Sequence, residues 1–258
     1  MPRSAVRSRA VLAFALFVVI LYAVFTGVTG TRLLLLASRT RALPETSLGI
    51  TYIVGGMLGW AAVLVGGGII DRAPEAGRLL NAVGLLCFSA GSLSLGLFCW
   101  RVFAPTSLGA RGLFFALLLM LIVDWVHNIL ILGTPFPPTT SFWYWPGMVG
   151  RTTLILWRPA AALPYYARLR KRLALGLADP VATNRVLLWG AAGALSATSS
   201  IFVVAVTLAD LWVTPARAPI AITTVVLATL DSALSWLAFV PPRRYIAWVK
   251  LRSAERGA

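Results

Sequence analysis

The segment LFFALLLMLIVDWVHNILILG, at residues 113–133, decides the fold class of this chain. It is nearly continuous in apolar side chains and carries one formally charged residue, Asp124. A helix needs about 20 mostly apolar residues to cross the hydrocarbon core of a bilayer. The segment therefore predicts a membrane-spanning helix. Four further stretches meet the same test: Val11–Gly30, Leu48–Ile70, Leu79–Trp100 and Pro219–Val240.

The composition of the whole chain is typical of a membrane protein. Of its 258 residues, 59% are hydrophobic and 12% are charged, and the mean hydropathy is +0.85. Soluble domains carry about 25% charged residues, so a soluble globular enzyme is excluded. The formal net charge of +15 would suggest nucleic acid in a soluble protein, but here the basic residues lie between apolar segments. We expect an all-α transmembrane helix bundle and no nucleic-acid partner.

Two weaker segments complete the predicted bundle. The first, Val186–Leu208, is polar at its centre, where four hydroxyl residues lie: Ser196, Thr198, Ser199 and Ser200. The second, Trp145–Tyr166, contains two basic residues and two prolines: Arg151, Arg158, Pro159 and Pro164. We count it as a span because no other segment joins its neighbours with consistent loop charge. The prediction is a seven-span domain over residues 1–240, followed by a basic tail at 241–258.

Loop charge sets the predicted orientation, because cytoplasmic loops of membrane proteins are enriched in Lys and Arg. With seven spans, 15 of the 23 basic residues fall on the side of the C-terminus and six on the side of the N-terminus. We therefore expect the N-terminus outside and the C-terminus in the cytoplasm. The first apolar segment follows three arginines, as a secretory signal does, but it lacks a small-x-small cleavage site. We expect it to remain as a helix.

Motifs for catalysis and for cofactors are missing from the sequence. It has no glycine-rich nucleotide-binding pattern, no H-E-x-x-H and no G-x-S-x-G. Two cysteines and one histidine are too few for a metal cluster, and one histidine cannot supply a bis-histidine haem site. Both lysines, Lys171 and Lys250, lie outside the spans, where retinal could not attach. We expect no cofactor and no metal.

Ionisable and polar side chains inside predicted spans are the candidate site residues, because such groups are costly in a bilayer and need partners. They are Asp124, His127 and Asn128 in the fourth span, Arg151 and Arg158 in the fifth, and Asp231 and Ser232 in the seventh. The offsets of three and four residues in the fourth span place its three members on one helix face.

Depth in the membrane predicts which of these residues pair. With a rise of about 1.5 Å per residue, Arg158 and Asp231 lie at similar depths, and Arg151 lies near the level of Asp124 and His127. We expect Arg158 to pair with Asp231, and Arg151 with Asp124 or the region of His127. Two interpretations remain open. The pairs could fix helix packing without a ligand, or they could form a binding or proton-responsive site among the fourth, fifth and seventh spans.

A basic cluster follows the fifth span, with four basic residues in five positions: Arg168, Arg170, Lys171 and Arg172. On the cytoplasmic side it would lie against anionic lipids of the inner leaflet, which attract each basic residue by about 1 kcal/mol. Gly176 is expected to end a short helix here, and Asp179 to cap the next. The tail has the composition of an interfacial amphipathic segment. It is too short for an output domain, so any signal requires a separate cytoplasmic partner.

Two motifs resemble those of a group of bacterial seven-span membrane proteins without a known activity. The first is RTRALPE at residues 39–45, and the second is RLALGLADPVATNRVLLWG at residues 172–190. The resemblance implies a seven-span protein of the bacterial plasma membrane. It also marks four residues as a cytoplasmic cluster: Glu45, Asp179, Asn184 and Arg185. It transfers no catalytic residue.

The leading interpretation of the sequence is a membrane-embedded sensor or adaptor, with a polar site in the bundle and a basic face for anionic lipids or a signalling partner. A small-solute transporter is the alternative. An enzyme ranks third, because only Asp124, His127 and Asp231 could serve as acid or base and no nucleophile or metal set accompanies them. The sequence assigns no oligomeric state.

Overall fold

The computed structural model describes residues 3–131, 139–210 and 217–254, and no strand occurs among them. In chain order the helices are α1 (Arg3–Thr40), α2 (Leu43–Ile50), η1 (Thr51–Leu58), α3 (Gly59–Ile69), α4 (Pro74–Phe103), α5 (Leu108–Trp125), η2 (Val126–Ile131), α6 (Tyr144–Ala174), α7 (Pro180–Leu208), α8 (Arg217–Phe239) and α9 (Arg243–Ala254). The segments η1 and η2 are π-helical. The predicted all-α class is confirmed for the described residues.

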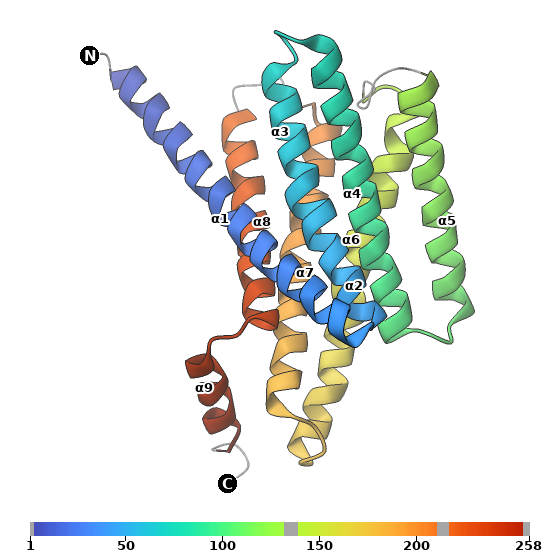
Figure 1. Ribbon diagram of the computed structural model, residues 1–258, viewed down its shortest axis with the longest axis vertical. Coiled ribbons are helices and arrows are strands. Elements are labelled where there is room, and N and C mark those ends of the chain that lie inside the picture. Colours follow the sequence, from blue (N-terminus) through green and yellow to red (C-terminus); the bar gives the residue numbers. More distant parts are fainter. Residues whose placement is uncertain (1–2, 132–138, 211–216, 255–258) are drawn as a thin grey trace.

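The long helices run back and forth along one axis (Figure 1). α2, η1 and α3 form one continuous pass, and the start of α1 lies at the opposite end of the bundle from α9. Within the described residues, six helical segments are long and apolar enough to cross a membrane: Phe17–Thr40, Leu43–Ile69, Pro74–Phe103, Leu108–Ile131, Pro180–Leu208 and Pro219–Phe239. α6 is not one of the six, but it packs against α4, α5 and α7.

Apolar side chains cover the outside of the bundle, and polar side chains lie inside it. Ile20 and Leu119 are 60% and 62% exposed. By contrast, Thr29, Asn128 and Ser235 are buried. A hydrocarbon solvent accepts apolar surface without cost, whereas polar groups must find partners within the protein. This distribution is that of an integral membrane protein.

Two predicted helix ends are wrong, because both helices continue beyond the apolar stretch. α1 runs ten residues past Gly30, so that Arg32 belongs to the helix and not to a loop. No glycine or proline follows Gly30 until the helix has ended, and Arg41 then adopts a positive φ of 52°. Likewise, α6 runs past Tyr166 to Ala174. The helix that ends near Gly176 is therefore 31 residues long and not a short helix.

The connection between α6 and α7 is formed by the two residues that the sequence predicts. Gly176 has a φ of +70°, and the N–H of Leu177 donates to the carbonyl of Arg172 at 2.8 Å. This is the Schellman pattern, in which glycine takes the left-handed conformation that ends a helix. Asp179 then accepts a hydrogen bond from the N–H of Ala182 at 2.8 Å. The helix end at Gly176 and the cap at Asp179 are both confirmed.

Parts of three predictions lie outside the described residues. These are the end of the fourth span at Gly133, the beginning of the loop that follows it, and the last four residues of the tail. The tail between Arg243 and Ala254 forms α9.

Aromatic packing fixes one end of the bundle. Trp189 of α7 lies edge-on to Phe98 of α4, with ring centroids 5.0 Å apart, and stacks on Phe103 at 5.9 Å. Tyr52 of η1 belongs to the same buried cluster and contacts Phe239 of α8. The cluster also includes Leu33 of α1 and Ala162 of α6, so it joins six passes and packs α7 beside α6.

Candidate functional site

Two ion pairs join α6 to its neighbours inside the bundle. Arg158 Nη1 lies 2.9 Å from Asp231 Oδ1 of α8, and Arg151 Nη1 lies 3.1 Å from Asp124 Oδ2 of α5. Both pairings are those that depth predicts. A fixed rise per residue places side chains at a calculable level in any antiparallel bundle, so opposite charges at the same level are the natural partners.

The guanidinium of Arg158 is fully engaged by protein groups. Its Nε donates to the carbonyl of Trp189 at 3.2 Å, and its Nη2 donates to Ser235 Oγ at 2.9 Å. Its carbon also lies 4.8 Å from the centre of the Trp189 ring. Each of its three nitrogens thus has a partner, and the side chain is only 4% exposed. Asp231 is held in turn by Ser196, whose hydroxyl donates to Oδ2 at 2.6 Å.

Gly193 of α7 makes room for this arginine. A Cβ atom at Gly193 would lie 2.8 Å from Cγ of Arg158, which is closer than such carbon atoms approach. The same relation holds at the other pair, where Gly147 of α6 packs directly against the carboxylate of Asp124. At both places a glycine lets one helix approach the charged side chain of another.

The second ion pair has a different environment. Asp124 is 1% exposed, and its Oδ1 accepts from Asn128 Nδ2 at 2.8 Å. Arg151 donates from the same nitrogen, Nη1, to Asp124 and to Ser89 Oγ at 3.4 Å. Its side chain is 20% exposed. Arg151 is therefore anchored on one side only.

His127 lies apart from this pair. Its ring stacks on Trp143, with centroids 3.7 Å apart and planes 14° from parallel. Its Nδ1 is buried without a hydrogen-bond partner. Asn128 donates from Nδ2 to Asp124 and also to the carbonyl of Trp143 at 3.3 Å, so Asn128 and His127 both contact Trp143.

A cavity of about 380 Å³ lies between α1, η1, α4, α6, α7 and α8. Its charged lining residues are Arg151, Arg158 and Asp231. Hydroxyl groups from several helices line it too, among them Ser92, Ser199, Ser200 and Ser232. Its size is within the range of small-molecule sites, and a few polar groups among apolar walls are typical of such sites.

The sequence locates only part of this cavity. No residue of α5 lines it, although the predicted site includes the fourth span. The walls formed by α1 and η1, including Tyr22 and Tyr52, are not predicted, because single tyrosines in apolar segments carry no signal. The hydroxyl run at residues 196–200 could have identified α7 as a wall, since polar side chains in a span face inward.

A second cavity, of about 500 Å³, lies where the end of α6, the start of α7 and α9 meet. Arg170 and Arg252 line it together with Trp248. Asn184 Nδ2 donates to Tyr245 Oη at 2.8 Å, which ties α9 to α7. The basic residues Lys171 and Arg172, which follow Arg170, are exposed.

The four residues marked by the family resemblance have separate contacts. Asp179 caps α7, Asn184 holds α9, and Arg185 is exposed. Glu45 Oε2 is buried without a hydrogen-bond partner. In the part of the chain that the structure describes, no hydrogen bond or ion pair joins any two of the four.

Groups that could hold a metal ion do not occur among the described residues, since no three His, Cys, Asp and Glu side chains lie close enough together. No family model, curated protein or solved structure matches this chain.

Proposed function

We propose that this chain is a seven-span plasma-membrane protein that binds a small polar solute in its central cavity and acts as a membrane-embedded sensor. The observation that carries the proposal is the cavity itself. Its mainly apolar walls carry the charged side chains of Arg151, Arg158 and Asp231, and it lies inside a bundle whose outer surface is apolar. A polar solute would find hydrogen-bond partners there that the surrounding lipid cannot offer.

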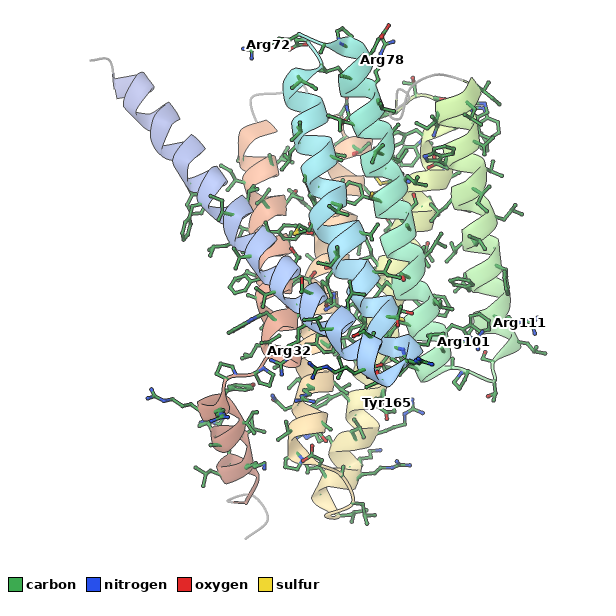
Figure 2. The ribbon with its side chains drawn as sticks, in the orientation of Figure 1. Arg32, Arg72, Arg78, Arg101, Arg111 and Tyr165 are labelled. Atoms are coloured by element: carbon green, nitrogen blue, oxygen red, sulfur yellow. The ribbon has the colours of Figure 1, made fainter. Side chains whose placement is uncertain are left out.

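In this proposal α6, which contains the predicted fifth span, is added to the six apolar segments and brings the number of spans to seven. Figure 2 places Arg72 and Arg78 at one end of the bundle, and Arg101 and Arg111 at the other end, at about the level of Tyr165 of α6. The stretch of α6 before Tyr165 thus runs alongside the apolar helices. Its arginines are engaged by aspartates of neighbouring helices, which lowers the cost of placing them in a membrane.

The basic residues at the end of α6 and in α9, among them Arg170, Lys171, Arg172 and Arg252, support a cytoplasmic position for the end that carries α9, since Lys and Arg are enriched on that side of bacterial membranes. A reporter that is active only outside the cell, fused after Lys171, tests both proposals. It should stay inactive, and a matched cytoplasmic reporter should be active. External activity would remove the seven-span topology with an outer N-terminus.

A sensor role is favoured by the continuity of α6. This one helix lines the central cavity with Arg151 and Arg158 and the second cavity with Tyr166 and Arg170. A helix that contacts two sites can transmit a change at one to the other, here through the segment that contains Pro159 and Pro164. Solute at the central cavity would thereby change the position of the basic end, where a cytoplasmic partner would bind.

Limited trypsin digestion tests this coupling in purified protein, because trypsin cleaves after Arg170, Lys171 and Arg172. A bound solute should change the cleavage rate in this segment severalfold, while proteoliposomes loaded with the protein should not accumulate the solute. Cleavage that is independent of a solute known to bind would exclude the sensor.

Transport is the second candidate, and one observation favours it. The wall contributed by α2, η1 and α3 contains the π-helical segment Thr51–Leu58, and π-helical segments are frequent at functional sites. Gly55 in this segment lies directly against Gly91 of α4, so the pass could slide there without side chains in the way. Solute uptake into proteoliposomes would establish transport in place of sensing.

The basic end would also contact anionic lipids of the inner leaflet. Arg170 and Arg252 line the second cavity beside Trp248, and this combination of basic and aromatic side chains suits a phospholipid headgroup at the membrane interface.

A further inference from the structure

We propose that the solute held in the central cavity is a small organic monoanion, bound through its carboxylate by the guanidinium of Arg151. This inference rests on the proposed solute-binding function and adds the chemical class of the solute. It is based on the different numbers of hydrogen-bonding groups that remain free on the three charged side chains that line the cavity.

Asp231 is not available to a cationic solute. Its Oδ1 receives Arg158 at 2.9 Å and Ser235 at 3.3 Å, and its Oδ2 receives Ser196 at 2.6 Å. Its charge is balanced by that of Arg158. Because Asp231 is the one acidic residue among the lining residues, a cation in the cavity would meet no uncompensated negative charge.

Arg158 offers less to an anionic solute. All three of its nitrogens donate to protein oxygens, and its guanidinium carbon lies 4.8 Å from the centre of the Trp189 ring. Its role is therefore to join α6, α7 and α8. Its two remaining N–H groups belong to nitrogens held against Asp231 and Ser235, on a side chain that is only 4% exposed.

Arg151 differs in each respect. Both of its hydrogen bonds leave from Nη1, so the N–H groups of Nε and Nη2 remain free. The side chain lines the cavity and is 20% exposed. Its counter-ion, Asp124, is 1% exposed and is not among the lining residues. The charge that Arg151 presents to the cavity is therefore positive, and its Nε and Nη2 donors do not bond to Asp124.

A planar carboxylate matches these free donors. Two adjacent N–H groups of a guanidinium bind the two oxygens of a carboxylate in parallel. Arg151 is the lining arginine whose Nε and Nη2 donors have no protein partner, and one such pair of donors accommodates one carboxylate, which favours a monoanion. The rest of the cavity combines hydroxyl groups such as Ser199 and Ser200 with the rings of Trp60 and Phe88, so a short apolar or hydroxylated carbon skeleton fits beside the acid group.

The test is thermal unfolding of the purified full-length protein in lipid nanodiscs with four probes at matched ionic strength. Sodium lactate and sodium benzoate supply monoanions, choline chloride supplies a cation, and glucose supplies a neutral polar solute. At least one carboxylate should raise the Tm in a saturable way. The cation should not.

Two variants assign the effect to Arg151. Arg151→Gln alone leaves Asp124 buried without a counter-ion, so the double variant Asp124→Asn with Arg151→Gln is the informative one, because it removes both charges and leaves no buried ion unpaired. It should lower the affinity for the carboxylate by about tenfold or more, the loss of one charge-assisted contact. Asp124→Asn alone frees Nη1 and should bind the carboxylate at least as tightly as the wild type.

Each outcome decides the inference. A carboxylate effect that persists in the double variant would place the anion elsewhere and overturn it. A Tm rise with glucose or choline and none with either carboxylate would also overturn it, while leaving the proposed solute-binding function intact. No response to any of the four probes would count against both.

Discussion

The pairing of Arg158 with Asp231 leads to a prediction whose size follows from burial. Arg158 is 4% exposed and Asp231 is 14% exposed, and their side chains meet at 2.9 Å. Asp231→Asn leaves a buried guanidinium without a counter-charge, and Arg158→Gln leaves a buried carboxylate in the same state. Removing one partner of such a pair costs about 3–5 kcal/mol of unfolding free energy.

The double variant should cost much less than the sum of the two single variants. Once both charges are gone, neither isolated ion remains, and the loss is confined to the hydrogen bonds and the packing of Arg158 on Trp189. We expect a coupling energy of about 2–3 kcal/mol between Arg158 and Asp231, which is at the upper end of values for residues in direct contact.

Unfolding by SDS in mixed micelles, followed by circular dichroism, measures these free energies. The matched control is the cycle of Arg158→Gln with Asp124→Asn, because Asp124 belongs to the other ion pair and shares no bond with Arg158. That cycle should be additive within about 0.5 kcal/mol. Additive losses in the first cycle, or single losses below about 1 kcal/mol, would refute the pairing.

Three further predictions follow from single contacts. Gly193→Ala places a methyl group against the side chain of Arg158 and should lower the unfolding free energy by about 1–3 kcal/mol. The control is Gly112→Ala, which has no neighbouring atom within 4 Å and should not lower the unfolding free energy. Equal effects of the two changes would contradict the packing argument. Tyr245→Phe removes the hydrogen bond that ties α9 to α7 and should speed trypsin cleavage within α9, so an unchanged rate would mean that the bond does not hold the helix. Replacing Arg170 and Arg252 together by Gln should reduce the anionic phospholipid that co-purifies with the protein, as measured by mass spectrometry, and undiminished anionic lipid would exclude the second cavity as its site.

The membrane-spanning helices could be predicted from the sequence because the bilayer imposes a length and an apolar composition on each of them. Their ends could not be predicted equally well. The membrane determines only where a helix must be apolar, and a helix continues into the polar region as far as its residues allow. α1 therefore ends at Thr40 and α6 at Ala174, beyond the predicted Gly30 and Tyr166. Where a local signal exists, as at Gly176, the end is predicted correctly.

The two ion pairs could be predicted for a related reason. The depth of a side chain in the membrane depends only on its position along the helix axis, and the residue number gives that position. Which direction around the helix a side chain faces depends on how each helix is rotated against its neighbours, and that is decided by packing across many contacts. Hence Asp231 was identifiable as the partner of Arg158, while Trp189 and Ser196 on α7 were not.

Arg151 and Arg158 show how the rotation of a helix about its axis, which the sequence does not predict, affects function. Both are arginines of one helix, seven residues apart and on one face, and both pair with an aspartate. Arg158 faces α7 at Gly193, where the absence of a side chain lets the backbone and the Trp189 ring close over the guanidinium. At Arg151, the glycine is Gly147, which lets the carboxylate of Asp124 pack against α6. Asp124 does not line the cavity. The glycine beside each arginine thus separates the guanidinium whose three nitrogens are held by protein groups from the one that keeps free donors for the proposed ligand.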